Sequence, residues 1–194
     1  EIISKFNRIP IMTILQTLDD IGVKYGTDKS SKGHDYLRHY DRVLSPFRGE
    51  DLTFIEIGGL NGASLKMWEE YFPRATIVCI DINPSVAQFA TDRIRVEIGN
   101  AASPAFLKSI LNRYERPKIV LDDGSHRWDH QRTSFQEFLP VIVEGGILII
   151  EDIHTSYEPN FAGSELFPFS SHMQIYVDYL HQRGANRRQY EQKY

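Results

Sequence analysis

The sequence is poor in cysteine, with one such residue among 194. Cys79 lies inside a predicted strand, so no disulfide can form within the chain and the fold must depend on a packed core. A reducing compartment suits such a chain, and we expect it in the cytoplasm.

Long apolar runs and excess basic charge are also lacking. No segment approaches the roughly 18 apolar residues of a membrane span, and the N-terminus shows no signal-peptide pattern. The net charge of -4 argues against general nucleic-acid binding. The basic cluster at Arg183, Arg187 and Arg188 is interpreted as a solvated helix end. We therefore expect neither nucleic acid nor a membrane as a partner.

The rest of the composition is that of a globular domain, with 41% apolar and 25% charged residues. Ile11, Ile14, Leu15, Leu18 and Ile21 predict an amphipathic helix near the N-terminus, and a second helix is expected over 36–44. We divide the chain into an N-terminal helical or lid segment, 1–48, packed on a main domain, 49–194.

Strands and helices alternate along the main domain. Short apolar runs predict strands, and apolar residues at helical spacing predict helices between them. One helix is marked by Phe135, Phe138, Leu139 and Ile142 and ended by Gly145. The pattern predicts an α/β fold with a doubly wound, mainly parallel sheet. The predicted strands are 52–57, 76–82, 94–98, 118–122 and 147–150.

A glycine-rich turn after the first predicted strand is the strongest local signal. Gly58, Gly59 and Gly62 permit positive φ and close approach of the backbone to a ligand, and a helix follows directly. Glu56 stands two residues before Gly58, which favours a cationic ligand, and the spacing is not the Gly-x-Gly-x-x-Gly of nicotinamide enzymes. A nucleotide-like ligand is expected here, although such a turn can also only pack helix on strand.

A second ligand signal is Asp81, at the end of the next predicted strand. A carboxylate at that position can accept hydrogen bonds from the vicinal hydroxyls of a ribose. The alternative is a turn-initiating aspartate before Asn83-Pro84.

Carboxylates gather where the fourth and fifth predicted strands end. Asp122 and Asp123 follow one strand, Glu151 and Asp152 the other, and neighbouring strands would bring them together. Such a group calls for a cation, and oxygen donors favour magnesium. His126 could take a proton from a bound hydroxyl, since histidine titrates near neutral pH, or it could be a capping or core histidine. A zinc site using His126 and His130 on one helix face ranks below magnesium.

Taken together, the motifs resemble the macrocin and mycinamicin family of sugar O-methyltransferases. The similarity spans Tyr25 to about Gly163. The segments that carry it are Tyr25-Gly-Thr-Asp-Lys29, His39-Tyr40-Asp41, Glu56-Ile-Gly58, Ala63-Ser64-Leu-Lys-Met-Trp68, Tyr71-Phe-Pro-Arg74, Asp122-Asp-Gly-Ser-His126, Arg132-Thr-Ser-Phe135 and Glu151-Asp152.

The resemblance implies a Rossmann-like class I fold and an O-methyltransferase dependent on S-adenosylmethionine (SAM) and magnesium. Its acceptor would be a deoxysugar hydroxyl of a macrolide-type natural product, and His126 its general base. The metal ligands would be Asp123, Asp152 and the upstream Asp41. The implied cofactor contacts are Glu56, Gly58, Gly59, Gly62, Ser64, Asp81, Gly99, Asn100 and Asp122.

The chain departs from the family pattern in three places. Members of the family carry Glu where this chain has Asp41, and often Gly-Asp-Gln where it has Gly99-Asn100-Ala101. A class I methyltransferase also closes its sheet with an antiparallel hairpin, and no sixth or seventh strand is predicted after Tyr157. Either the sequence ends before those strands or the sheet is shortened.

Several alternatives follow from the same residues. A catechol offers the same pair of oxygens as a sugar diol, and residues 161–169 with the first helix are expected to line the acceptor pocket. A metal-dependent hydroxylase of the cephalosporin type resembles the family in fold and metal site. A non-catalytic SAM-binding module could keep the fold, and a homo-oligomer is possible.

Overall fold

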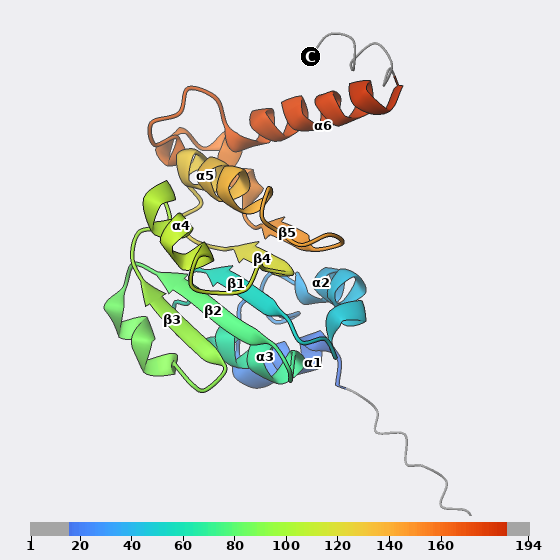
Figure 1. Cartoon of the computed structure of the whole chain (residues 1–194), viewed down its shortest axis with the longest axis vertical. Helices are drawn as coiled ribbons and strands as arrows, with labels where there is room; N and C mark the ends of the chain where they lie inside the picture. Colours follow the sequence, from blue (N-terminus) through green and yellow to red (C-terminus); the bar gives the residue numbers. More distant parts are fainter. Residues whose placement is uncertain (1–15, 186–194) are drawn as a thin grey trace, which may run out of the picture.

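The computed structural model describes residues 16–185, which contain a five-stranded parallel sheet (Figure 1). The strand order is β3-β2-β1-β4-β5, and each neighbouring pair runs parallel. This is the doubly wound order of a Rossmann-like fold, as the alternating pattern predicted. The strands are β1 (Thr53–Ile57), β2 (Thr76–Asp81), β3 (Ile94–Ile98), β4 (Ile119–Asp122) and β5 (Ile147–Ile150).

Helices cover both faces of the sheet and bury two separate cores (Figure 1). On one face α1, α2 and α3 pack on side chains such as Phe54, Ile77 and Leu121. On the other face α4 and α5 pack on the alternate residues, including Ile55 and Val120. The helices are α1 (Leu18–Tyr25), α2 (Leu37–Leu44), α3 (Ala63–Tyr71), α4 (Pro104–Leu111), α5 (Trp128–Phe138) and α6 (Phe169–Ala185).

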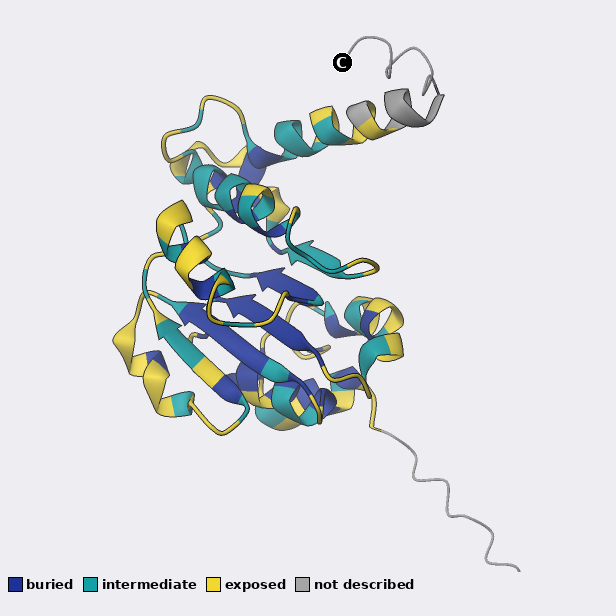
Figure 2. Ribbon diagram, in the orientation of Figure 1, coloured by how far each residue is buried: buried dark blue, intermediate teal, exposed yellow. Residues whose placement is uncertain are grey.

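The central strands are the most deeply buried part of the sheet (Figure 2). All residues of β1 and β4 are buried, whereas every residue of the edge strand β5 is half-buried. Continuous apolar runs are expected where both faces of a parallel strand are covered. The exception in β1 is Glu56, a carboxylate with no exposed surface.

Local signals fix several helix ends. The Thr17 side chain accepts a hydrogen bond from the Asp20 backbone and the Asp20 side chain accepts one from the Thr17 backbone, which makes a capping box for α1. Gly26 ends that helix in the left-handed conformation. At α4, Ser103 caps the helix and Pro104 occupies its first turn.

The prediction for α5 was wrong at its C-terminal end. The helix begins at Trp128 and ends at Phe138, so Ile142 and Gly145 lie beyond it. Pro140 explains the early stop, because proline has no backbone N–H to donate to the Gln136 carbonyl four residues earlier. Ile142 still packs against the core, from the turn that follows.

The helix predicted near the N-terminus and the segment after β5 can be compared with the structure only within residues 16–185. Much of the predicted N-terminal helix lies outside the described residues, and α1 begins only at Leu18. Between residues 16 and 185 no strand follows β5, as the sequence predicted. Within the same range no helix combines the length and apolar character needed to cross a membrane. The division into 1–48 and 49–194 stays a prediction.

Candidate active site

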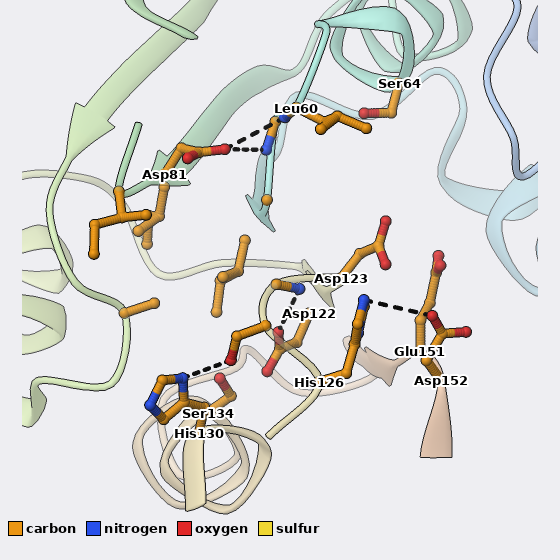
Figure 3. Close-up of a pocket in the computed structure, with 18 of the residues that line it drawn as sticks. Leu60, Ser64, Asp81, Asp122, Asp123, His126, His130, Ser134, Glu151 and Asp152 are labelled. Carbon is orange, nitrogen blue, oxygen red and sulfur yellow. Dashed lines mark hydrogen bonds and ion pairs between the residues drawn. The ribbon is translucent and has the colours of Figure 1, made fainter. Parts of the chain in front are cut away.

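A cavity of about 610 Å³ lies at the sheet's carboxyl edge. It opens where β1 and β4 lie side by side and their crossovers leave toward opposite faces, which is the usual place for ligands in such sheets. Asp81 lies at one side of the cavity and Asp123, His126 and Asp152 at the other (Figure 3). Most predicted site residues line it: Gly58, Gly59, Ser64, Asp81, Gly99, Asn100, Asp122, Asp123, His126 and Asp152.

The glycine turn forms one wall and is tied to Asp81 (Figure 3). The backbone amides of Gly59 and Leu60 donate to Asp81 Oδ2 over 2.7 and 3.3 Å. The amide of Asn83 donates to Asp81 Oδ1 over 2.8 Å. Asp81 therefore fixes the glycine turn and also the turn that begins at Asn83. Because it lines the cavity as well, its turn-forming role does not prevent it from contacting a ligand.

Gly58 sits where the turn meets β4. Its φ is +93°, and a Cβ there would overlap the carbonyl oxygen of Asp123. Only a residue without a side chain lets the turn and the Asp123 backbone approach this closely.

Gly58→Ala should therefore cost about 1 to 3 kcal/mol more of the free energy of unfolding than Gly145→Ala. Both positions have positive φ, so both variants strain the backbone. At Gly145 a Cβ would meet only Lys118 Nζ, at 3.6 Å, which is ordinary contact. Urea unfolding of the two variants measures the difference, and equal losses would contradict the overlap.

Two residues expected to contact the cofactor do not line the cavity. Glu56 lies beneath the turn, where its carboxylate accepts hydrogen bonds from Ser64 Oγ at 3.0 Å and Trp68 Nε1 at 3.2 Å. Gly62 begins α3, and the Phe89 ring occupies the space where its side chain would be. Both residues shape the turn from below rather than facing the cavity.

The protonation of Glu56 should be visible in the stability of the protein. Burial raises the pKa of Glu56 to about 8, and the positive charge of Lys29 opposes that rise. Since glutamate in an unfolded chain titrates near 4.5, the folded chain binds more protons between these two pH values. The free energy of unfolding that Glu56 contributes must then fall as the pH rises through this window, by at most about 1.4 kcal/mol per pH unit.

Glu56→Gln, which imitates the protonated acid, should remove this fall. We expect the stability of the wild type relative to the variant to decrease from pH 5 to pH 8 in urea unfolding. Glu70→Gln is the control, because hydrogen bonds from Lys24 and Tyr25 lower the pKa of Glu70 and give no such decrease. A relative stability that stays level or rises would contradict the assignment.

Three side chains converge at the other wall of the cavity. Asp123, His126 and Asp152 each place one potential ligand atom within 4.8 Å of the other two. His126 Nε2 lies 3.5 Å from Asp152 Oδ2 (Figure 3). The pairing of β4 with β5 brings them together, as the sequence predicted. His126 and Asp152 both adopt positive φ, at 58° and 55°, a conformation that costs a residue with a side chain about 1–3 kcal/mol.

A buried lysine lies behind this group and was not predicted. Lys29 is 2% exposed, and its Nζ contacts Asp123 Oδ2 and lies 3.0 Å from Glu151 Oε2. Burial alone would lower the pKa of Lys29, but the charges of Glu151, Glu56 and Asp123 outweigh it and raise the pKa. Lys29 therefore stays charged and stabilises the carboxylates instead of accepting protons.

Asp123, Glu151 and Asp152 together form what we call the acidic wall of the cavity. Two tyrosines at the start and in the middle of α2 contact it. Tyr36 donates to Asp152 Oδ1 over 3.0 Å, and Tyr40 donates to Glu151 Oε1 over 2.8 Å. The two tyrosines are four residues apart, so they share one face of the helical turn.

Asp41 does not join the group, although the resemblance implied it as a metal ligand. The Tyr71 hydroxyl donates to its Oδ1, and Asp41 lines a separate depression with Thr17, Asp19 and Arg38. Adjacent helical residues point about 100° apart, which directs Asp41 to α3 while Tyr40 reaches the acidic wall. Asp41 is therefore excluded from the metal site proposed below.

The histidine pair considered for zinc is also excluded. His126 precedes α5, whose N-cap is Arg127, so His126 and His130 do not share a helix face. His130 Nδ1 lies 2.6 Å from Ser125 Oγ instead. The segment 161–169, expected to line the acceptor pocket, contributes no residue to the lining of this cavity among the described residues.

The chain is similar in sequence to known O-methyltransferases. No protein-family model matches the chain. It is 37% identical over 154 residues to L-olivosyl-oleandolide 3-O-methyltransferase of Streptomyces antibioticus, covering 75% of this chain and 39% of that protein. It is 35% identical over 153 residues to demethylmacrocin O-methyltransferase of Streptomyces fradiae, covering 75% and 38%. The chain thus spans about two fifths of the length of these relatives.

A solved structure agrees with the fold. The MycE methyltransferase from the mycinamycin biosynthetic pathway, in complex with Mg and SAH, superposes with a TM-score of 0.79 at 32% sequence identity. The match covers 84% of this chain and 48% of that one. The sheet and its helices are thus those of a class I, Rossmann-like methyltransferase fold.

Proposed function

We propose that this chain, a homologue of the sugar O-methyltransferases over three quarters of its length, transfers a methyl group from SAM to a hydroxyl of a sugar diol. One observation carries the proposal: Asp123, His126 and Asp152 converge on a cavity whose opposite wall is the glycine turn. The acceptor class comes from the relatives, among them a mycinamicin VI 2''-O-methyltransferase.

The cavity suits a ligand of the size and chemistry of SAM. Its volume lies in the range of small-molecule sites, roughly 300–1,000 Å³. Gly58 and Gly59 present bare backbone to it, and Asp81 offers a carboxylate for ribose hydroxyls. Ser64, Gly99, Asn100 and Asp122 complete the set that we assign to the cofactor.

The acidic wall suits a magnesium ion. Asp123 and Asp152 supply the hard oxygen donors that magnesium prefers, and we assign both as its ligands. When bound, the ion supplies positive charge that makes an acceptor hydroxyl more acidic. Lys29 holds Asp123 and Glu151 in place from behind, and Tyr36 orients Asp152.

His126 is the group that we assign as general base. Its Nε2 faces Asp152 at the cavity wall and would take the acceptor's hydroxyl proton. As that proton leaves, the oxygen forms a bond to the methyl carbon and the bond from that carbon to sulfur breaks. Positioned proton transfer of this kind contributes about 10²- to 10⁴-fold to a rate.

A methyl-transfer screen over sugar diols and catechols, with and without magnesium, tests the proposal. We expect turnover of a diol that needs magnesium and is lost in Asp152→Asn. Asp41→Asn is the matched control, since it makes the same chemical change outside the cavity. Turnover that does not depend on magnesium, or an equal loss in both variants, would contradict the assignment.

We also place the reaction in the cytoplasm, and this rests on the sequence. The chain has a single cysteine, Cys79, so no disulfide can form within it, which suits a reducing compartment. A homo-oligomer stays a prediction, which sedimentation of the purified protein can test.

A further inference from the structure

A threonine outside the cavity connects the two halves of the acidic wall. Thr155 lies in a short 3-10 helix, Ile153–Tyr157, that follows β5, and it is 2% exposed. Its hydroxyl oxygen lies 2.9 Å from the carbonyl oxygen of His126 and 2.9 Å from that of Asp152. One buried hydroxyl thus touches the backbones of two residues that follow different strands.

Both of those residues need to be held. His126 and Asp152 adopt positive φ, which residues with side chains adopt only where their surroundings enforce it. A change of backbone at either residue would redirect its side chain and separate His126 Nε2 from Asp152 Oδ2. Their relative position therefore depends on contacts to the backbone as well as on the two side chains.

The hydroxyl of Thr155 matters most for His126. The backbone amide of Thr155 already donates to the Asp152 carbonyl over 3.0 Å, so that carbonyl has a partner without the hydroxyl. Within residues 16–185 the Thr155 hydroxyl makes the one hydrogen bond found to the His126 carbonyl. Losing the hydroxyl would leave this carbonyl without a protein partner.

Helix α5 fixes Thr155 in turn. Trp128 Nε1 donates to the Thr155 carbonyl over 2.8 Å, and Gln131 Nε2 donates to the Glu151 carbonyl over 3.1 Å. Both donors are buried side chains at the start of α5, directly after the turn that carries His126. The segments 126–131 and 151–155 are thus joined by three separate side-chain hydrogen bonds, one of which is the Thr155 hydroxyl.

We propose that Thr155 is a positioning residue of the metal and base site, which sets His126 against Asp152 through hydrogen bonds to their backbones. The inference rests on the proposed function. Residues that orient metal ligands from outside typically change metal affinity by about 10- to 100-fold when they are replaced.

Thr155→Val and Thr155→Ser separate this role from packing. Valine keeps the shape and removes the hydroxyl, whereas serine keeps the hydroxyl and removes the methyl group. Thr133→Val is the control, because the Thr133 hydroxyl donates to the Asp129 carbonyl within α5 and does not reach the cavity. If the valine variant does not fold, Thr155→Ala replaces it with the same expectation.

Calorimetric titration of Mg²⁺ and Mn²⁺ into each protein, saturated with S-adenosylhomocysteine, gives the affinities without turnover. We expect Thr155→Val to weaken ion binding by about tenfold or more, and Thr155→Ser and Thr133→Val to stay within about threefold of the wild type. Equal affinity in Thr155→Val and the wild type would overturn the inference alone. A wild type that binds neither ion would overturn the proposed function, and the inference with it.

Discussion

His126→Gln should lower the turnover number for methyl transfer by about 10²- to 10⁴-fold, the usual contribution of a positioned general base. Glutamine keeps a polar side chain of similar reach but cannot accept the acceptor's proton. Asp81 and the glycine turn lie at the opposite side of the cavity, so the affinity for SAM should change little. Single-turnover assays and a calorimetric titration of the cofactor measure the two effects separately.

His39→Gln is the matched control for that experiment. His39 is an exposed histidine of α2 that does not line the cavity, so its replacement should leave turnover within about twofold. A His126→Gln enzyme that turns over as fast as His39→Gln would remove His126 from the chemistry. A loss of cofactor affinity that matches the loss of turnover would instead make His126 a binding residue.

Lys29→Met should reduce the free energy of unfolding by about 3–5 kcal/mol, the cost of removing one partner from a buried ion pair. Glu151 would lose the ammonium 3.0 Å away, and the buried Glu56 would lose a neighbouring positive charge. Burial already raises the pKa of Glu151 to about 7. Without the lysine the carboxylates should be protonated even more readily, so the loss should be larger at pH 8 than at pH 5.5.

Lys24→Met supplies the comparison for Lys29→Met. Lys24 pairs with Glu70 at 2.5 Å, but its side chain is 50% exposed, and surface pairs of this kind contribute little to the free energy of unfolding. Urea unfolding of both variants at the two pH values tests the difference. Equal losses, or a Lys29→Met loss that is independent of pH, would mean that Lys29 does not stabilise the acidic wall.

The arrangement of strands could be predicted because it rests on local patterns. Continuous apolar runs such as residues 119–121 of β4 mark strands covered on both faces, and the carboxyl ends of neighbouring strands meet at one edge of a parallel sheet. That rule was enough to bring Asp123 and Asp152 together. The end of α5 was predicted too late, because the apolar spacing continues through Leu139 and Ile142. The helix ends at Phe138, before Pro140, and proline is the stronger signal.

Lys29 could not be predicted, because its partners are far away along the chain. Asp123 follows it by 94 residues and Glu151 by 122, and a lysine in a polar loop is ordinarily exposed. The signal that could have identified it was the Tyr25-Gly-Thr-Asp-Lys29 segment, which was noted only as part of a resemblance.

Side-chain direction limited the prediction in two other places. Tyr40 and Asp41 are neighbours in α2, so their side chains leave the helix in different directions. Tyr40 therefore reaches Glu151, whereas Asp41 reaches Tyr71. Similarly, Glu56 alternates to the face covered by α3, where it meets Ser64 and Trp68 rather than facing the cavity. Sequence spacing placed Glu56 near the site and the family resemblance placed Asp41 there, but only packing determined where the two side chains point.

Diffraction from crystals grown with Mn²⁺ and S-adenosylhomocysteine tests the central claim most directly, because manganese gives an anomalous signal at a site that suits magnesium. We predict one anomalous peak in contact with carboxylate oxygens of both Asp123 and Asp152, beside a cofactor bound against Gly58 and Gly59. A peak on Asp41, or a cavity that holds the cofactor while the ion binds elsewhere, would contradict it.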